Sequence, residues 1–380
     1  MTLDFTTKTK DLIDNLKGIC ANNGLGNDGN EFKIITQVFL YKFMNDKFGY
    51  ELKELDPKLK KSENWEKDIA KYSDKEYEKL ILKMNPDSAK LKREHFLSYL
   101  HNRQNESDFA KFFDDTLRDI SIFNNDIFSV KTEEGSKVIL FDELSSYITG
   151  SAKRKDDFCR AIINQLVNFS FEKIFTQKFD FFSTIFEYLI KDYNKDGGGK
   201  YAEYYTPHAV SKIMASILVD KKVSNVTCYD PAAGSGTLLM NLAHIIGEDR
   251  CTIYSQDISQ KSSSMLRLNL ILNNLVHSIQ NIIQGNTLLH PYHKNGDNLA
   301  TFDYVVSNPP FKLDFSDWRD NLDSKVHSDR FFAGIPNKTP KSPDKMAIYL
   351  LFIQHIMYSL SAKGKAAIVV PTGFITAQSG

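Results

Sequence analysis

Hydrophobic positions in the first 160 residues recur with the spacing of an α-helix. The stretch TKDLIDNLKGIC places Leu12, Leu16 and Ile19 on one face, and the apolar run at 32–48 continues the pattern after a Gly- and Asn-rich loop. This spacing predicts an all-helical N-terminal domain over residues 1–160. The domain is either a docking surface for a protein or for DNA, or a structural bundle, and the sequence leaves both interpretations open.

From residue 201 onward, short apolar runs alternate with helix-like stretches, a pattern typical of a mostly parallel α/β sheet. Strands are predicted at 226–230, 251–257, 281–284, 302–307 and 366–371, with helices at 236–246, 262–275 and 346–360. Two earlier helices are predicted at 158–175 and 179–193, before a glycine-rich connector at 194–200. We therefore expect a second, α/β domain over residues 161–380.

Composition supports a folded chain with two domains, because 380 residues exceed what one hydrophobic core usually serves. Hydrophobic residues at 42% and charged residues at 25% exclude a disordered chain. We see no apolar run long enough to span a membrane and no basic-then-apolar leader. The four cysteines are widely spaced, as expected of reduced thiols in a cytoplasmic protein.

The net charge bears on possible partners. The 48 basic residues are balanced by 48 acidic residues. Proteins that bind nucleic acid alone usually carry a basic excess, because neutralising phosphates supplies most of the non-specific affinity. A net charge of zero therefore argues against DNA binding by this chain alone, but it permits DNA binding that is shared with a partner. The N-terminal region has no metal-spaced His/Cys cluster, and we predict no metal site.

The stretch YDPAAGSGTLLM (229–240) ends a predicted strand at Asp230 and opens a predicted helix. Its glycines allow close backbone approach, and its small side chains leave room for a ligand over the strand end. The residues concerned are Ala233, Gly234, Ser235 and Gly236. The turn is not a P-loop, because no Lys follows the second glycine. Taken alone, it is also compatible with a plain tight turn.

The next two strand ends carry further polar residues. Asp257 ends the strand at 251–257, at the spacing where an acid in a doubly wound sheet accepts hydrogen bonds from both ribose hydroxyls. Turn and acid together indicate an adenosine-containing ligand. Asn286 follows the third predicted strand and is expected at the same edge.

The fourth predicted strand ends in Asn308, Pro309, Pro310 and Phe311, although proline has no N–H for a sheet ladder. An amino group on an aromatic base is a poor nucleophile, because its lone pair is delocalised into the ring. The Asn308 side-chain oxygen and the Pro309 carbonyl would hold both N–H bonds and direct the lone pair toward an electrophile. The prolines stiffen the loop, and Phe311 is placed to stack on the base. The plain alternative is a proline-rich turn.

DPAAGSG followed by NPPF resembles the amino-methyltransferases that use S-adenosylmethionine. The earlier segment KYAEYYTPHAV (200–210) is similar to the GQFYTP segment of the methylation subunit of bacterial type I restriction–modification systems. The order of the three segments is that of the gamma class of adenine-N6 enzymes. The resemblance implies a Rossmann-like S-adenosylmethionine-dependent methyltransferase sheet after the helical domain. It also implies that the methionine end of the cofactor contacts Tyr204, Tyr205, Thr206 and Pro207.

Function and partners follow from the same resemblance. It implies methyl transfer from S-adenosylmethionine to adenine N6 in duplex DNA, with the base flipped from the stack. The implied partners are DNA, a specificity subunit, a second copy of this chain and, in the full complex, a restriction subunit. Family members continue beyond the fifth strand, so we expect the C-terminal end of the catalytic domain to be missing here.

The sequence departs from the family pattern at three places before that end. Ala202 and Glu203 stand where the family usually has Gly-Gln, and Ala233 replaces a frequent cysteine. Asn286 stands where related enzymes often carry an aspartate that meets the adenine amino group of the cofactor. Its side-chain oxygen is expected to accept that hydrogen bond instead. Thr206 and Pro207 are expected to be the N-cap and first residue of a helix.

Other functions stay open at this point. Protein-glutamine and RNA amino-methyltransferases also use NPP-aromatic loops, and a cofactor-binding subunit without turnover is a non-enzymatic alternative. A cytosine-C5 enzyme is disfavoured, because it needs a Pro-Cys nucleophile that the sequence lacks. The stretch 312–345 is expected to be either a DNA-facing loop that orders on substrate or an inert mobile loop.

Overall fold

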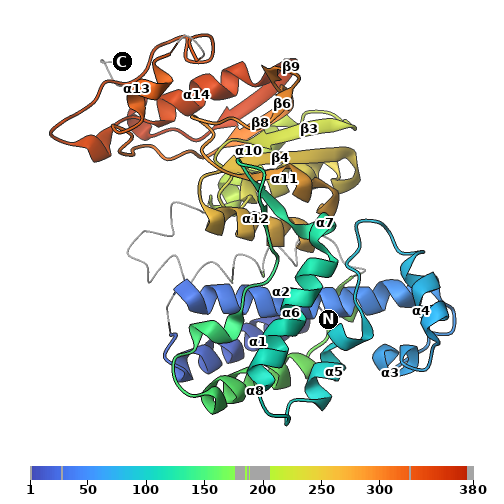
Figure 1. Cartoon of the computed structure of the whole chain (residues 1–380). Coiled ribbons are helices and arrows are strands. Elements are labelled where there is room, and N and C mark those ends of the chain that lie inside the picture. The colour runs from blue at the N-terminus through green and yellow to red at the C-terminus, as the bar shows by residue number, and fades with distance from the viewer. Residues whose placement is uncertain are drawn as a thin grey trace. The chain divides into compact units, whose positions relative to one another are not determined.

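The computed structural model describes residues 2–26, 29–175, 185, 188, 206–324 and 327–374. The chain forms two compact units, each with its own set of elements (Figure 1). The helical unit comprises residues 1–129 and 139–199, and the sheet unit comprises residues 130–138 and 200–380. The predicted domain boundary after residue 160 falls inside helix α8 (Ala152–Val167) of the helical unit.

The helical unit is built around α2 (Gly29–Leu55), which is buried on several faces because its apolar residues are not confined to one stripe. The other helices are α1 (Thr2–Asn22), α3 (Trp65–Ile69), α4 (Asp74–Ile81), α5 (Leu97–Asn102), α6 (Phe109–Phe123), α7 (Asn125–Phe128) and α8, with the 3-10 helices η1 (Arg93–His95), η2 (Leu144–Tyr147) and η3 (Glu172–Ile174). Phe171 packs edge-on against Phe39 and Phe43 of α2, with ring centroids 5.0 and 5.9 Å apart. This contact fixes the segment after α8 on α2.

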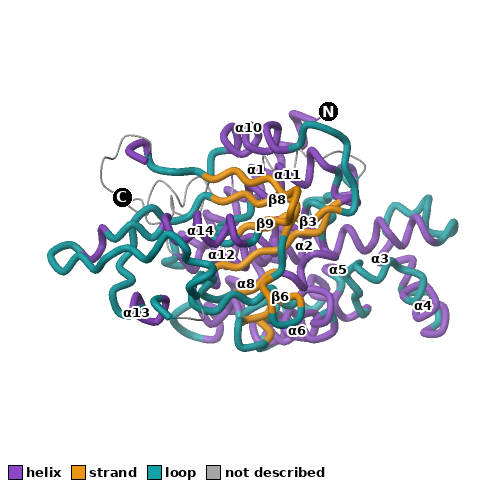
Figure 2. Tube along the Cα trace, turned by 90° about the horizontal axis from the view of Figure 1, so that it is seen from above, coloured by secondary structure: helices purple, strands orange, loops and turns teal. Residues whose placement is uncertain are grey.

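The sheet unit contains a seven-stranded sheet in the order β2-β1-β5-β4-β3-β8-β9. Its strands are β1 (Val130–Thr132), β2 (Lys137–Val138), β3 (Val226–Asp230), β4 (Cys251–Asp257), β5 (Ile282–Gln284), β8 (Phe302–Ser307) and β9 (Leu360–Ile368). All neighbours pair in parallel except β1 and β2, and the strands lie side by side through the unit (Figure 2). A separate hairpin joins β6 (Lys294–Asn295) to β7 (Asn298–Leu299). The predicted α/β sheet is confirmed.

Helices connect and cover these strands. They are α10 (His208–Leu218), α11 (Thr237–Ile246), α12 (Gln260–Leu272), α13 (Arg319–Leu322) and α14 (Tyr349–Tyr358), with the 3-10 helices η5 (Glu248–Arg250), η6 (Val276–Asn281), η7 (Pro343–Lys345) and η8 (Thr372–Phe374). Helix α12 packs on β4 and β5, α11 packs on β3 and β4, and α14 packs on β9. The helix predicted at 179–193 and the connector at 194–200 lie outside the described residues, apart from Ile185 and Tyr188.

The prediction of an entirely helical stretch from 1 to 160 is wrong at residues 130–138. There the chain forms the β1–β2 hairpin, in which Val130 pairs with Val138, and β1 joins the sheet beside β5. Gly135 forms the turn at φ +86°, a conformation that glycine adopts without strain. Strands of three and two residues are too short to show an alternating pattern in the sequence. The hairpin is stabilised instead by the pairing of β1 with β5.

Strand β9 also differs from its prediction at 366–371. It begins at Leu360, six residues earlier, and ends at Ile368. Gly364 lies in the strand, where a side chain would collide with the carbonyl oxygen of Phe302. The register with β8 shifts at this point, so glycine permits the close approach rather than ending the strand.

A hydrophobic cluster anchors part of the stretch 312–345, and its role as a DNA-facing loop stays a prediction. Three residues of the stretch, Phe315, Leu322 and Phe331, are buried together. They pack with Leu288, Met346, Ile348, Leu351 and Phe352. Arg330 beside them is 3% exposed, and its guanidinium donates to the carbonyl oxygens of Thr287 and Leu288. The stretch is therefore tied to the turn after β5.

Replacing Phe331 by alanine is expected to lower the free energy of unfolding of the sheet unit by about 3 kcal/mol, because the ring is 5% exposed and leaves a cavity. The neighbouring Phe332 is 59% exposed and provides a matched control. Urea unfolding followed by circular dichroism measures both variants. Equal effects of the two substitutions would show that this cluster does not anchor the stretch.

Candidate active site

Asp230 ends β3 and lies deep under the carboxyl edge of the sheet. Its side chain is 1% exposed, and Oδ1 accepts hydrogen bonds from the Ala232 N–H at 2.9 Å and from the Ser307 hydroxyl at 2.8 Å. Burial raises the pKa of Asp230 to about 7, although these two hydrogen bonds oppose the shift. The carboxyl group is therefore near its titration point at neutral pH.

The glycine turn follows directly and starts α11. Gly234 and Gly236 have φ of +53° and +80°, in the left-handed region that favours glycine. A side chain at Gly236 would also collide with Leu266 of α12. The N–H of Gly236 donates to the Ala233 carbonyl at 2.8 Å, which closes the turn. The turn thus leaves bare backbone at the strand end, as predicted for a ligand cradle.

Asp257, at the end of β4, lies against this turn. Its Oδ2 accepts a hydrogen bond from the Gly234 N–H at 2.9 Å, and its Oδ1 accepts one from the Ser259 N–H at 2.8 Å. Burial raises the pKa of Asp257, and the two N–H groups counteract this by stabilising the anion. The structure therefore brings the predicted turn and the predicted acid into direct contact.

Asn308 follows β8, which pairs in parallel with β3 and so ends at the same edge. Its side-chain Nδ2 donates to the Thr206 hydroxyl at 3.2 Å. Among the described residues, one small pocket is lined by both of these residues together with Asp230 and the glycine turn. Its lining is Thr206, Asp230, Ala232, Ala233, Gly234, Ser235, Thr237, Leu238 and Asn308. Three motifs that lie far apart in the sequence thus meet at one place.

The rest of the tetrapeptide continues along this edge. Pro309 is buried, Pro310 is exposed and Phe311 is half-buried. The Phe311 ring meets Tyr349 edge-on, with centroids 6.4 Å apart. Phe311 therefore keeps an accessible ring next to the asparagine.

The segment before α10 is described only from Thr206 onward, so Tyr204 and Tyr205 lie outside the described residues. The prediction that Thr206 caps the helix is wrong by one residue. Pro207 is the N-cap, without a side-chain hydrogen bond, and α10 begins at His208. The Thr206 hydroxyl instead accepts from Asn308, because the residue lies two positions before the helix and its side chain is 8% exposed in the pocket wall.

Asn286 lies two residues beyond β5, and its oxygen is already engaged. Oδ1 accepts hydrogen bonds from the N–H groups of Leu288 and Leu289 at 3.0 and 3.2 Å. The next residue, Thr287, donates its hydroxyl to the Pro231 carbonyl at 2.7 Å and joins this turn to the one after β3. Asn286 is therefore at the predicted edge, but its side chain stabilises its own turn.

Sequence reasoning missed Glu133, Ser307 and Arg330. Ser307 was within a predicted strand, and its position beside Asp230 could have been inferred only from the strand order. Glu133 lies in the unpredicted hairpin, and its carboxylate accepts the Asn286 N–H at 2.6 Å. The Val-Lys-Thr run before a Gly-containing turn is compatible with a strand of a hairpin, but three residues are too few to predict one.

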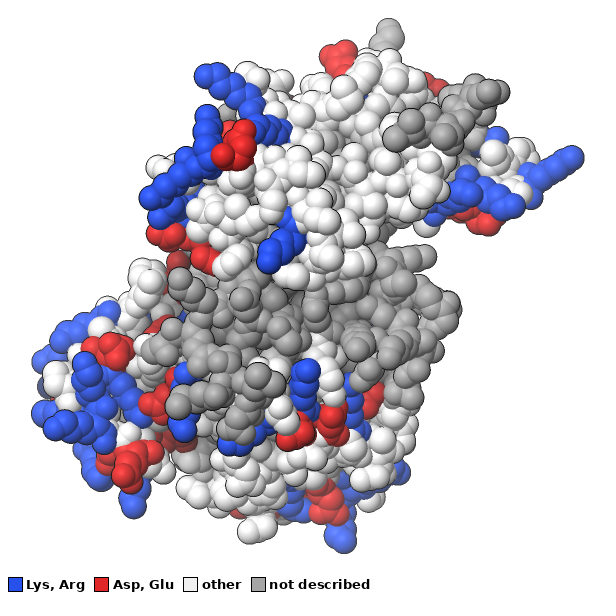
Figure 3. Space-filling model, turned by 180° about the vertical axis from the view of Figure 1, so that it is seen from behind, with Lys and Arg blue, Asp and Glu red and all other residues white. Residues whose placement is uncertain are grey.

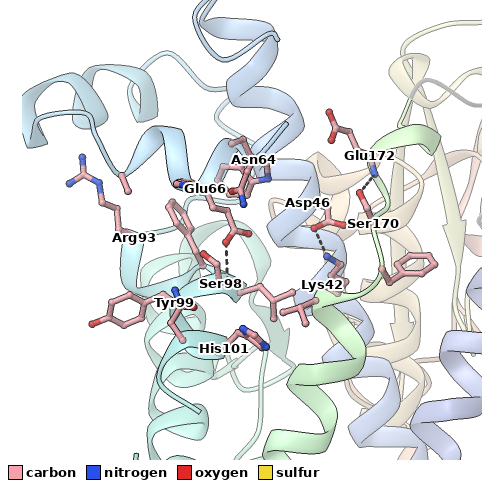
Figure 4. A pocket seen from close by; sticks show the side chains of 18 of the residues that line it. Lys42, Asp46, Asn64, Glu66, Arg93, Ser98, Tyr99, His101, Ser170 and Glu172 are labelled. Atoms are coloured by element: carbon pink, nitrogen blue, oxygen red, sulfur yellow. Dashed lines mark hydrogen bonds and ion pairs between the residues drawn. The ribbon is translucent and has the colours of Figure 1, made fainter. Parts of the chain in front are cut away.

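A larger cavity of about 980 Å³ lies within the helical unit (Figure 4). Its charged walls are largely paired internally: Lys42 meets Asp46 at 2.9 Å, and Glu66 accepts the Ser98 N–H at 2.9 Å (Figure 4). The first contact lies within α2 and the second joins α3 to α5, while Asn45 of α2 donates to Glu66 at 2.8 Å. We interpret them as stabilising the helical unit.

Two broader properties concern the described residues only. None of their helices is long and apolar enough to cross a membrane. Within the same part of the chain, no group of three or more His, Cys, Asp or Glu side chains is arranged to hold a metal ion.

Residues 177–380, more than half of the chain, match the sequence family described as N-6 DNA Methylase. The chain belongs to the N-6 DNA methylase family. The match contains the glycine turn, Asp257, Asn308 and the strands that carry them. The pocket lined by the glycine turn and Asn308 thus lies within the part of the chain that matches the N-6 DNA methylase family.

Curated relatives resemble the same part of the chain. The methylase subunit of the type I restriction enzyme MpnII from Mycoplasma pneumoniae is 32% identical over 203 residues, covering 52% of this chain and 36% of the relative. That of MjaIX from Methanocaldococcus jannaschii is 29% identical over 222 residues, covering 57% of this chain and 37% of the relative. This N-6 DNA methylase family member thus aligns with little more than a third of either relative.

A solved structure has the same fold over almost the whole chain. The methyltransferase subunit of a type I restriction–modification system from Streptococcus thermophilus superposes with a TM-score of 0.72 at 19% identity, covering 98% of this chain and 75% of that subunit. The likeness includes the helical region that the N-6 DNA methylase family match does not reach. The fold of a helical region followed by a methyltransferase-type sheet is confirmed.

Proposed function

We propose that this chain transfers a methyl group from S-adenosylmethionine to N6 of adenine in duplex DNA, as the modification subunit of a type I restriction–modification complex. The observation that carries the proposal is the meeting of Asn308, Thr206 and the glycine turn in one pocket. The order of these segments along the chain favours the gamma class of adenine-N6 enzymes. The type I methylase subunits among its relatives support the assignment to that system.

The orientation of Asn308 suits an acceptor role. Its Nδ2 is engaged by the Thr206 hydroxyl at 3.2 Å, so Oδ1 is the atom left to accept a hydrogen bond from a substrate. The Pro309 carbonyl is the second acceptor beside it. Holding both N–H bonds of an adenine amino group in this way directs its lone pair out of the ring system and needs no covalent intermediate on the protein. The half-buried Phe311 ring stacks on the base plane.

The pocket residues fit an adenosine cofactor. The turn has Gly234 and Gly236 in the left-handed conformation that favours glycine, and Asp257 offers carboxylate oxygens beside it. When bound, S-adenosylmethionine supplies an activated methyl group on a positively charged sulfur. The residues that would hold it are Thr206, Pro207, Asp230, Ala233, Gly234, Ser235, Gly236 and Asp257. Tyr204 and Tyr205 remain predicted contacts at the methionine end.

DNA binding is proposed to be shared with a specificity subunit, a second copy of this chain and, in the full complex, a restriction subunit. On the face of the helical unit in Figure 3, basic and acidic side chains are intermingled rather than gathered into one basic field. The balanced charge of the chain agrees with this arrangement. Residues 1–160, apart from the hairpin at 130–138, are proposed to serve as the docking region, in the cytoplasm.

The proposal is tested by transfer of labelled methyl groups in the reconstituted complex. Unmethylated duplex DNA containing the recognition sequence is expected to accept label as N6-methyladenine, identified by mass spectrometry of nucleosides. Label on a peptide glutamine or on RNA instead would establish one of the rival methyltransferases. Cofactor binding without transfer to any of these would establish a non-catalytic subunit.

A further inference from the structure

The β1–β2 hairpin places an acidic residue at the edge of the sheet that the proposed cofactor site uses. Lys131 and Thr132 of β1 pair in parallel with Ile283 and Gln284 of β5. The next N–H, that of Glu133, donates to the Gln284 carbonyl at 2.9 Å. Glu133 therefore leaves the sheet at the same carboxyl edge as Asn286, although 153 residues separate them in the sequence.

The Glu133 carboxylate is held by groups of the turn after β5. One oxygen accepts the Asn286 N–H at 2.6 Å, and the other lies 3.1 Å from His290 Nδ1. Gly285 makes this approach possible, because a side chain there would collide with the carboxylate. The Glu133 side chain is still 26% exposed, so it is accessible at this edge.

Asn286 does not offer its own acceptor at this place. Its oxygen accepts two N–H groups of the following turn, from Leu288 and Leu289. Turning it toward a ligand would leave both N–H groups without that partner. A carboxylate oxygen has two lone pairs, so Glu133 can accept another hydrogen bond while keeping the Asn286 N–H.

We propose that Glu133 is the acceptor for the exocyclic amino group of the cofactor's adenine, supplied by the hairpin in place of Asn286. The inference rests on the proposed function, because it assigns a specificity-determining residue to the same cofactor site. A negatively charged acceptor favours an amino group and disfavours a carbonyl at the same ring position. Glu133 thus selects adenosine over inosine at the base end of the cofactor.

The test measures binding by calorimetry, with S-adenosylhomocysteine and its inosine counterpart as probes of the complete chain. The unaltered protein is expected to favour the adenosine compound. Glu133→Gln is expected to weaken binding of that compound about 10- to 100-fold. The affinity for the inosine compound is expected to stay the same or to increase. The Gln amide can donate to the carbonyl of the inosine base while its oxygen still accepts the Asn286 N–H. Glu134→Gln, an exposed neighbour with the same charge change, is the control.

The outcomes separate this inference from the proposed function. If Glu133→Gln weakens both compounds equally, with an unchanged melting temperature, Glu133 merely supports the turn and the inference fails. Equal affinity of the unaltered protein for the two compounds would also overturn it, while leaving the proposed function intact. Failure of the unaltered protein to bind either compound would instead count against the proposed function.

Discussion

Asn308→Ala is expected to lower the rate of methyl transfer by at least about 100-fold while leaving affinity for S-adenosylmethionine nearly unchanged. The reason is that different residues of the pocket serve the cofactor and the target base. The glycine turn and Asp257 form the cofactor side through backbone and carboxylate groups, whereas the Asn308 side chain donates to the Thr206 hydroxyl on the wall segment before α10. Removing the amide therefore deletes the acceptor for the target amino group without touching the cofactor cradle.

Single-turnover transfer to duplex DNA in the reconstituted complex and calorimetric titration of the cofactor measure the two effects separately. Asn298→Ala is a matched control, because that asparagine is exposed in β7 of the β6–β7 hairpin. Parallel losses of transfer and cofactor affinity in Asn308→Ala would place Asn308 in the cofactor site rather than at the target base. Retained transfer would remove it from the mechanism.

The strands that carry the site were predictable, because each is a short apolar run ending in a polar or turn residue. The predicted strands at 226–230, 251–257 and 302–307 coincide with β3, β4 and β8. Since parallel strands end at one edge, the sequence alone also predicted that Asp230, Asp257 and the tetrapeptide would be neighbours. The structure bears out this juxtaposition by direct contacts between Asp257 and the turn.

The contributions from distant segments were not predictable. The hairpin at 130–138 is stabilised by the pairing of β1 with β5, and its strands are too short to show a periodic pattern in the sequence. The burial of Arg330 and Phe331 depends on carbonyls and apolar side chains that come from the turn after β5 and from α14. The hydrogen bonds of Asn286 depend on how the following turn folds. Such features are decided by tertiary contacts, which override local pattern.

Asp230→Asn is expected to stabilise the cofactor-free protein relative to the unaltered chain above pH 7, by up to about 4 kcal/mol. Burial raises the pKa of Asp230 from 3.8 to about 7. Between these values the folded protein holds a proton that the unfolded chain releases, so the free energy of unfolding falls as pH rises through this window. Below about pH 4 both states are protonated and the difference disappears.

Asparagine suits the site, because its oxygen can still accept the Ala232 N–H and its amide can donate to the Ser307 hydroxyl. The measurement is the difference in urea midpoint between variant and unaltered protein at several pH values from 5 to 8. Other buried acids titrate in both proteins, so their contributions to the pH dependence cancel in that difference. Asp249→Asn, an exposed substitution in η5, should leave the pH dependence unchanged. A difference that stays constant with pH would mean that Asp230 is ionised throughout, with its charge held by the turn.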